Sequence, residues 1–153
     1  MTFATADAGV LIEGLDREQE VYVALRELSR RQDEIIASQG QVETLLEVLG
    51  RKQALLSEVE AIERRLRPVK DAWEQERETQ PSELRVQVET RVRALRDVLG
   101  EVVALEERGR TELARQQQAV AAEIRNVGRT RQAHHAYAGG SVTPPSRRID
   151  DTG

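Results

Sequence analysis

Hydrophobic residues recur along the C-terminal half of the chain at alternating steps of four and three, the spacing that places them on one face of an α-helix. Pro81, just before them, suits a first helical turn. Val92 and Leu99 add a second row, which makes the apolar stripe wide enough to need more than one partner helix. The main row comprises Leu84, Val88, Leu95, Val98, Val102 and Leu105, with Arg91 at its one polar step. The pattern predicts one helix from Pro81 to about Gln132, roughly fifty residues and on the order of 75 Å long.

A first, shorter helix is predicted from Asp16, a residue type that caps helices, to about Ser38. Its apolar row comprises Val21, Leu25, Leu28 and Ile35, with Gln32 as a polar member. Gly40 suits a helix end but is also tolerated inside a helix at a cost of about 1 kcal/mol, so the pattern leaves open whether a turn follows.

A second helix is predicted from Val42, where the apolar row restarts in a shifted register. Pro68 should kink or end it, because proline lacks a backbone donor and clashes with the preceding turn. Trp73 falls on the same heptad row as the leucines, which favours a place in the core over a binding role. The row comprises Leu45, Leu49, Leu56, Val59 and Leu66, with Lys52 within it.

These patterns predict an all-α fold, an elongated, coiled-coil-like antiparallel three-helix bundle with a long third helix. The predicted organisation is a flexible N-terminal segment over residues 1–15, a helical bundle over residues 16–138 and a disordered tail over residues 139–153. The tail is rich in Gly, Pro and Ser, which favour neither a helix nor a core.

Helix lengths give the first indication of function. If the second helix has about 35 residues and the third returns beside it, the shared rise per residue exhausts their pairing near Gln118. Val120, Ile124 and Val127 would then overhang the bundle as an apolar stripe without an intramolecular neighbour. Such a stripe is typical of a partner-binding site.

Composition narrows the class of protein. The chain has 153 residues, of which 3% are aromatic and 33% charged, so its core must be aliphatic and narrow. It has no cysteine, no signal peptide pattern and no apolar run that approaches the ~20 residues of a membrane span. A soluble cytoplasmic protein is expected. The formal net charge of -4 argues against general nucleic-acid binding.

No residue pattern supports catalysis or a cofactor. The carboxylates alternate with arginines on helix faces that should be solvated, and there is no phosphate-binding glycine loop. His134 and His135 are adjacent, so on a helix they point about 100° apart and do not form a metal pair. The sequence predicts neither an enzyme nor a metalloprotein.

Two segments carry a resemblance to a known family. The run GQVETLLEVLGRKQALLSEVEAIERR, from Gly40 to Arg65, resembles the second helix of FlgN-type flagellar export chaperones, with a lysine followed by paired leucines. The ending YAGG, from Tyr137 to Gly140 and followed by a basic polar tail, is similar to that family's terminus. The three-helix layout agrees, and the resemblance covers about Asp16 to Gly140.

The resemblance implies a cytosolic chaperone that binds hook-filament junction (hook-associated) proteins, prevents their premature assembly and delivers them to the type III export gate. It implies that the C-terminal helix takes the client, a role that would fall on Val120, Ile124 and Val127. It also implies that Tyr137 contacts the export gate.

The alternative is a structural coiled-coil scaffold or spacer without a client, assembled through the Leu84 to Leu105 seam. A structural coiled coil should keep its seam regular to the end, whereas this one loosens after Leu105. The sequence leaves open which client is bound and whether the free protein is a monomer or a homodimer.

Overall fold

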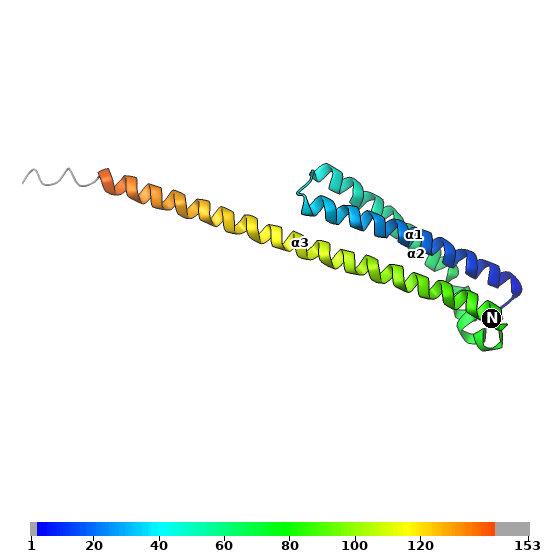
Figure 1. Cartoon of the computed structure of the whole chain (residues 1–153). Coiled ribbons are helices and arrows are strands. Elements are labelled where there is room, and N and C mark those ends of the chain that lie inside the picture. The colour runs from blue at the N-terminus through cyan, green and yellow to red at the C-terminus, as the bar shows by residue number, and fades with distance from the viewer. Residues whose placement is uncertain (1–2, 143–153) are drawn as a thin grey trace, which may run out of the picture. The chain divides into compact units, whose positions relative to one another are not determined.

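Helices account for nearly all of the computed structural model, which describes residues 3–142 and the side chains of residues 3–136. The order is α1 (Thr5–Ala37), α2 (Val42–Glu76), a short 3-10 helix η1 (Arg77–Thr79) and α3 (Ser82–Val142) (Figure 1). Residues 3–142 contain no strand. The chain divides into two units after Glu112, so α3 contributes to both. The predicted all-α class with three helices and a long third helix is confirmed.

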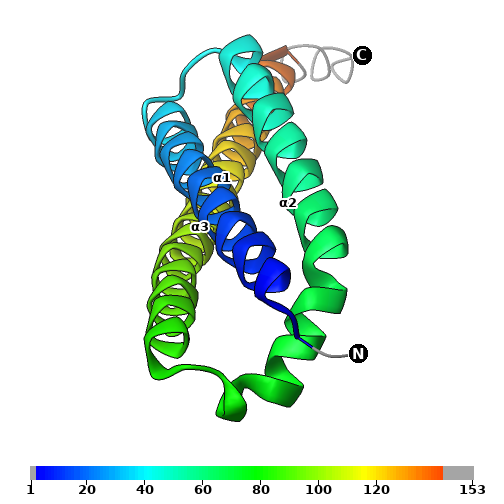
Figure 2. The ribbon, with the colours of Figure 1, turned by 90° about the vertical axis from the view of Figure 1, so that its right-hand side faces the viewer.

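The first unit is an antiparallel three-helix bundle in which α2 reverses the direction of α1, and α3 reverses that of α2 (Figure 2). The closest backbone approaches are between α1 and α2. At one of them Gly14 is buried, and a Cβ built there would lie 2.5 Å from the methyl carbons of Leu66. The α3 helix approaches this pair less closely and contributes Val88, Val98 and Val102 to the core.

The N-terminal start of α1 differs from the expectation. The helix begins at Thr5 and not at Asp16, so most of the segment expected to be flexible is helical. Leu11 and Leu15 are buried there at 1% and 2% exposure. The local sequence contains two glycines and gives a weak helix signal, but burial of these leucines against the other helices outweighs it. Asp16 lies inside the helix and accepts a hydrogen bond from Arg91 Nε on α3 at 2.8 Å.

Phe3 fixes the first residues to the end of α2. Its ring meets the Trp73 ring edge to face, with 5.2 Å between centroids. Its backbone N–H donates to a Glu76 carboxylate oxygen at 2.7 Å. The aromatic pair and the charge-assisted hydrogen bond together hold the N-terminal end of the chain in place. The sequence alone had suggested that this end is flexible.

The turn that the sequence left open is present between α1 and α2. Gln39 takes a left-handed conformation with φ 53°. The Gly40 N–H donates to Ile35 O at 2.8 Å, and the Gln39 N–H donates to Ile36 O at 3.1 Å. These two bonds form a Schellman motif, which ends a helix cleanly. The left-handed position falls on Gln39, one residue before Gly40.

Pro68 does not end α2, which continues to Glu76. The helix bends before it reaches the connection to α3 (Figure 2), as expected when a proline removes an intrahelical hydrogen bond. After η1, Pro81 accepts a hydrogen bond from the Arg85 N–H at 3.1 Å and so opens α3 where the sequence predicted.

The core of the first unit is a narrow aliphatic column to which all three helices contribute. One cluster of buried residues comprises Val21, Leu25, Val59, Ile62, Leu66, Val98 and Val102. The second comprises Phe3, Leu11, Leu15, Ala72, Trp73 and Val88. Trp73 is 6% exposed, which confirms its predicted place in the core.

The polar residues in the seams meet in one layer of this column. Lys52 is 7% exposed, and its amine donates to Gln32 of α1 and forms an ion pair with Glu106 of α3. Ser29 Oγ donates to the same Glu106 carboxylate at 2.9 Å. A buried amine is tolerated when its partners are close and hydrogen-bonded. The polar positions in the apolar rows of α1 and α2, Gln32 and Lys52, are therefore satisfied by bonding to each other and to Glu106.

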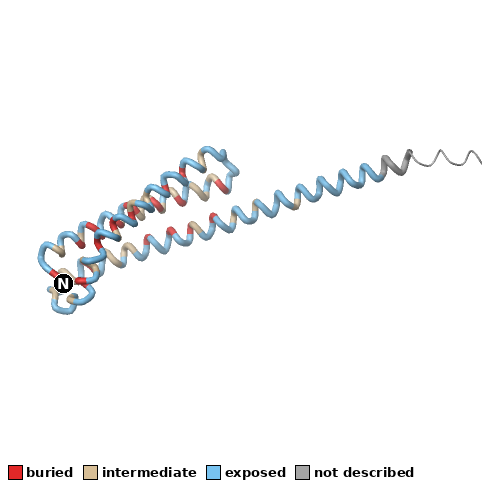
Figure 3. The backbone as a smooth tube through the Cα atoms, turned by 180° about the vertical axis from the view of Figure 1, so that it is seen from behind, coloured by how far each residue is buried: buried red, intermediate tan, exposed pale blue. Residues whose placement is uncertain are grey.

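Burial along α3 changes near Gly109. Up to that glycine the helix presents buried residues to the bundle, whereas from Arg110 to Ala136 none of its residues is buried (Figure 3). The helix continues to Val142, past the predicted end near Gln132 and into the residues expected to form the tail. Residues 143–153 of that expected tail lie outside the described part of the chain.

The left-handed residue in the α1–α2 turn gives a stability prediction. Gln39→Gly should raise the free energy of unfolding by about 0.5–1 kcal/mol, because glycine adopts a positive φ without steric strain. As a control, Gln53→Gly in the exposed interior of α2 should lower it by about 1 kcal/mol. Urea unfolding followed by circular dichroism measures both. A loss of stability in Gln39→Gly would contradict this description of the turn.

Candidate functional site

The three side chains predicted to form a partner site lie exposed on α3 in the second unit. Val120 is 53% exposed, Ile124 66% and Val127 48%. They follow one another at i, i+4 and i+7, so they share one face of the helix. Shallow hollows run along this face. We call these three residues the α3 stripe.

The seam residues of the same helix in the first unit provide a direct contrast. Val98 and Val102 are buried, at 6% and 9% exposure, and Leu95 is half-buried against the core. Residues of the same size and spacing are therefore covered in one part of α3 and exposed in the other.

Charge is unevenly distributed around the stripe. Between Leu113 and Ala136 the only carboxylate is Glu123, whereas four arginines are present: Arg115, Arg125, Arg129 and Arg131. By helical spacing Arg131 continues the stripe, and Arg125 and Arg129 occupy the opposite face. The second unit therefore presents an apolar face on a basic helix.

Tyr137 lies within α3, but its side chain is outside the described part of the structure. Its backbone lies within the last two turns of the helix, which ends at Val142. Its expected role stays a prediction.

The histidines and acidic residues do not form a metal site in the part that the structure describes. His134 and His135 are both exposed. No three His, Asp or Glu side chains among the described residues gather closely enough to hold an ion. Within the same residues no helix has the length and apolar character needed to cross a bilayer.

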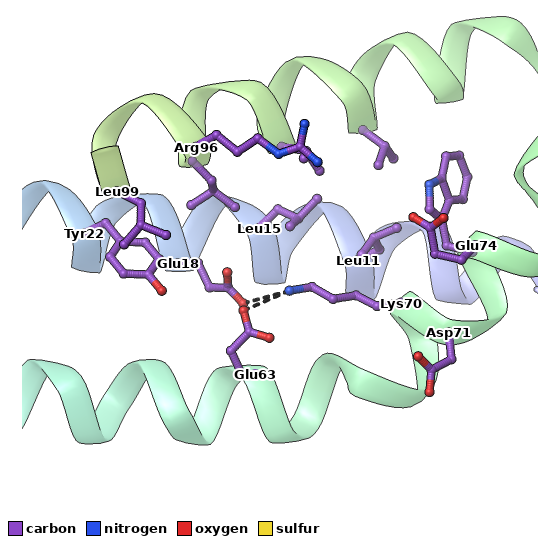
Figure 4. A pocket seen from close by; sticks show the side chains of 14 residues that line it. Leu11, Leu15, Glu18, Tyr22, Glu63, Lys70, Asp71, Glu74, Arg96 and Leu99 are labelled. Carbon is purple, nitrogen blue, oxygen red and sulfur yellow. Dashed lines mark hydrogen bonds and ion pairs between the residues drawn. The ribbon is translucent and has the colours of Figure 1, made fainter. Parts of the chain in front are cut away.

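A cleft that sequence analysis did not find opens between the three helices of the first unit (Figure 4). It has a volume of about 360 Å³. Its apolar lining residues are Leu11 and Leu15 from α1, Trp73 from α2, and Val88, Val92, Leu95 and Leu99 from α3. The only signal for this cleft in the sequence was the second apolar row of α3, formed by Val92 and Leu99. The α1 and α2 helices cover this row only in part.

Three ionisable side chains meet in this cleft between α1 and α2. Lys70 Nζ lies 2.9 Å from Glu63 Oε1 and 3.4 Å from Glu18 Oε1 (Figure 4). Glu18 is 2% exposed. Burial, with a hydrogen bond to Glu63, raises the pKa of Glu18 to about 7 although Lys70 opposes the shift. At neutral pH this carboxyl group is thus partly protonated.

The partners of Glu18 titrate differently. Burial alone would raise the pKa of Glu63, but hydrogen bonds with Glu18 and Lys70 lower it on balance. Burial likewise opposes the charge of Lys70, and its two carboxylate partners outweigh burial and raise the pKa of its amine. Tyr22 borders the cluster, and burial raises the pKa of its hydroxyl. The two carboxyls therefore share one proton and one lysine, so their titration belongs to the pair.

The raised pKa of Glu18 predicts how stability depends on pH. The folded state binds this proton more tightly than the unfolded state, whose carboxyl titrates near 4.5. Stability should therefore fall as pH rises from about 4.5 to about 7. In Glu18→Gln this loss of stability should be smaller than in the wild type by roughly 1–2 kcal/mol. The difference is less than the raised pKa of Glu18 alone would give, because the pKa of Glu63 is lowered.

Urea unfolding at pH 5 and pH 8 tests this expectation. The wild type should lose more stability than Glu18→Gln between the two pH values. Glu60→Gln, at an exposed position of α2, should keep the wild-type difference. An equal difference in wild type and Glu18→Gln would contradict the assignment.

Comparison with known proteins bears on the whole chain. The family model described as FlgN protein matches residues 1–143. No curated protein and no solved structure matches. The match includes all three helices, the α3 stripe and the cleft. The chain belongs to the FlgN protein family.

Proposed function

We propose that this protein binds hook-filament junction (hook-associated) proteins in the cytoplasm, prevents their premature assembly and delivers them to the flagellar export gate. Membership of the FlgN family carries the coarser role of a flagellar export chaperone. The identity of the client and delivery to the gate are our proposal.

The exposed α3 stripe is the observation that supports a client site. Val120, Ile124 and Val127 are aliphatic, regularly spaced and about half or more exposed on a helix that buries none of its residues between Arg110 and Ala136. Isolated apolar side chains on a surface are common, but a row at i, i+4 and i+7 matches the way one amphipathic helix recognises another. The client in this proposal presents an amphipathic terminal helix.

Chaperoning follows physically from this form of recognition. Terminal helices that later assemble into a filament have apolar faces that associate when they are left free. A helix bound along the α3 stripe has that face covered, so the same surface cannot nucleate assembly. Tyr137, near the end of α3, is the residue we propose for contact with the export gate, and this assignment rests on the family resemblance.

The proposal is tested by replacing the stripe with glutamines. In the variant Val120→Gln, Ile124→Gln, Val127→Gln, we expect affinity for the terminal helix of a hook-filament junction protein to fall at least about a hundredfold, because each apolar contact contributes about 1.5–3 kcal/mol before ordering costs. The thermal unfolding midpoint should change little, since the three side chains are exposed. Calorimetric titration and circular dichroism measure the two quantities.

Two matched triple variants complete the experiment. Leu95→Gln, Val98→Gln, Val102→Gln should unfold the first unit, because these residues face the core. Ala122→Gln, Arg125→Gln, Arg129→Gln alters the opposite face of the second unit and should retain most of the binding. If the stripe variant unfolds like the core variant, the stripe is ordinary core and the structural scaffold gains support. If it folds and binds with unchanged affinity, the client site lies elsewhere.

A further inference from the structure

We propose that the cleft of the first unit docks one face of a partner's amphipathic helix whose apolar residues are flanked by lysine or arginine on the edge facing α2. This site lies in the first unit, separate from the α3 stripe, and does not rest on the client assignment. Its occupant would complete a four-helix arrangement with α1, α2 and α3.

The dimensions of the cleft fit a helix face and not a whole helix. Its α1 wall runs from Leu11 to Tyr22, eleven residue steps that span about 16 Å, or about three helical turns. Its volume of about 360 Å³ is small for a helix that measures about 10 Å across with its side chains. A few apolar side chains on one face would fill it, with the partner's backbone outside.

The apolar surface that a partner could cover lies on the α3 wall of the cleft. Leu99 is 41% exposed and Val92 is half-buried, whereas Leu11 and Leu15 on the α1 wall are already covered. Because α3 approaches the other helices less closely than α1 approaches α2, its second apolar row is only partly covered. An inserted helix face would bury that remaining surface.

The charges of the cleft specify the partner's polar edge. Carboxylates line the α2 side: Glu63 within the cleft, and Asp71 and Glu74 exposed beside it (Figure 4). Lys70 already forms ion pairs with Glu63 and Glu18. Glu74 has a more distant cation, since its Oε2 lies 3.8 Å from Arg77 Nη1. Arg96 is the one cation of the lining on the α3 side. Because Glu18 is partly protonated and shares Lys70 with Glu63, that cluster has little net charge. The excess negative charge of the α2 side therefore comes from Asp71 and Glu74, and a basic edge on the partner is complementary there.

Trp73 provides a local probe. It is the only tryptophan of the chain and lines the cleft. Two synthetic amphipathic helical peptides of about three turns, both without aromatic residues, would have the same leucine face. One would carry lysines along one edge of that face and the other glutamates at the same positions. Binding of either peptide to the full-length protein is followed by the change in Trp73 emission.

The lysine peptide should bind about tenfold or more tightly than the glutamate peptide at low salt, and added salt should narrow the difference. Asp71→Asn, Glu74→Gln, at exposed positions that do not contribute to the core, should reduce the preference. Arg96→Gln should enlarge it. Equal affinities of the two peptides, or no change in Trp73 emission with either, would overturn the proposal.

Two further variants separate this site from the α3 stripe. The variant Val120→Gln, Ile124→Gln, Val127→Gln should retain the Trp73 response to the lysine peptide, and loss of that response would also overturn the proposal. Val92→Phe, which adds volume to the half-buried α3 wall, should weaken the lysine peptide by at least about tenfold. Unchanged affinity in a folded Val92→Phe protein would mean that the peptide does not enter the cleft.

Discussion

The length of α3 is the constraint on which the rest of the structure depends. It has 61 residues, whereas α1 has 33 and α2 has 35. Two helices of that length can flank only about half of the third. An apolar residue in the flanked half stabilises the fold through burial, whereas the same kind of residue in the other half is exposed. Val98 and Val102 in the first case, and Val120 and Ile124 in the second, show this difference within one helix.

The core that results is narrow, so its polar members are coupled to one another. Lys52 lies among aliphatic residues because Glu106 and Gln32 reach it from the other two helices. The Lys52 contact lowers the pKa of Glu106 against the raising effect of its burial. Further along the bundle, Glu18, Glu63 and Lys70 form a second polar cluster, where the carboxyls compete for one amine. Each cluster has one buried ionisable member, Lys52 in the first and Glu18 in the second, and removing its partner would leave that group unpaired in the core.

Sequence periodicity was enough to predict three helices, their order, the connection before α3 and the place of Trp73. These features depend on the spacing of apolar residues, which the printed sequence shows directly. The start of α1 at Thr5 was missed because the contacts that stabilise it, Leu11 and Leu15 with the other helices, are tertiary. Gly40 left the turn after α1 open, and the hydrogen bonds of the turn place the left-handed residue at Gln39, one position before it.

The two candidate binding surfaces differ in how far sequence could reveal them. The α3 stripe was predicted from helix lengths alone, and its side chains are exposed. The cleft depends on how closely α3 approaches α1 and α2, which no spacing of residues encodes. Its polar cluster joins Glu18 to two residues more than forty positions away, so no local motif marks it.

Hydrogen exchange of the full-length protein, with and without the terminal helix of a hook-filament junction protein, tests the central claim most directly. Amides of residues 113–136 should exchange rapidly in the free protein, since no residue of that segment is buried, and should slow around Val120 to Val127 when the client helix is added. Amides of residues 88–105 should be protected equally in both states. Slowing confined to the first unit, or no slowing around Val120 to Val127 despite measured binding, would contradict the account.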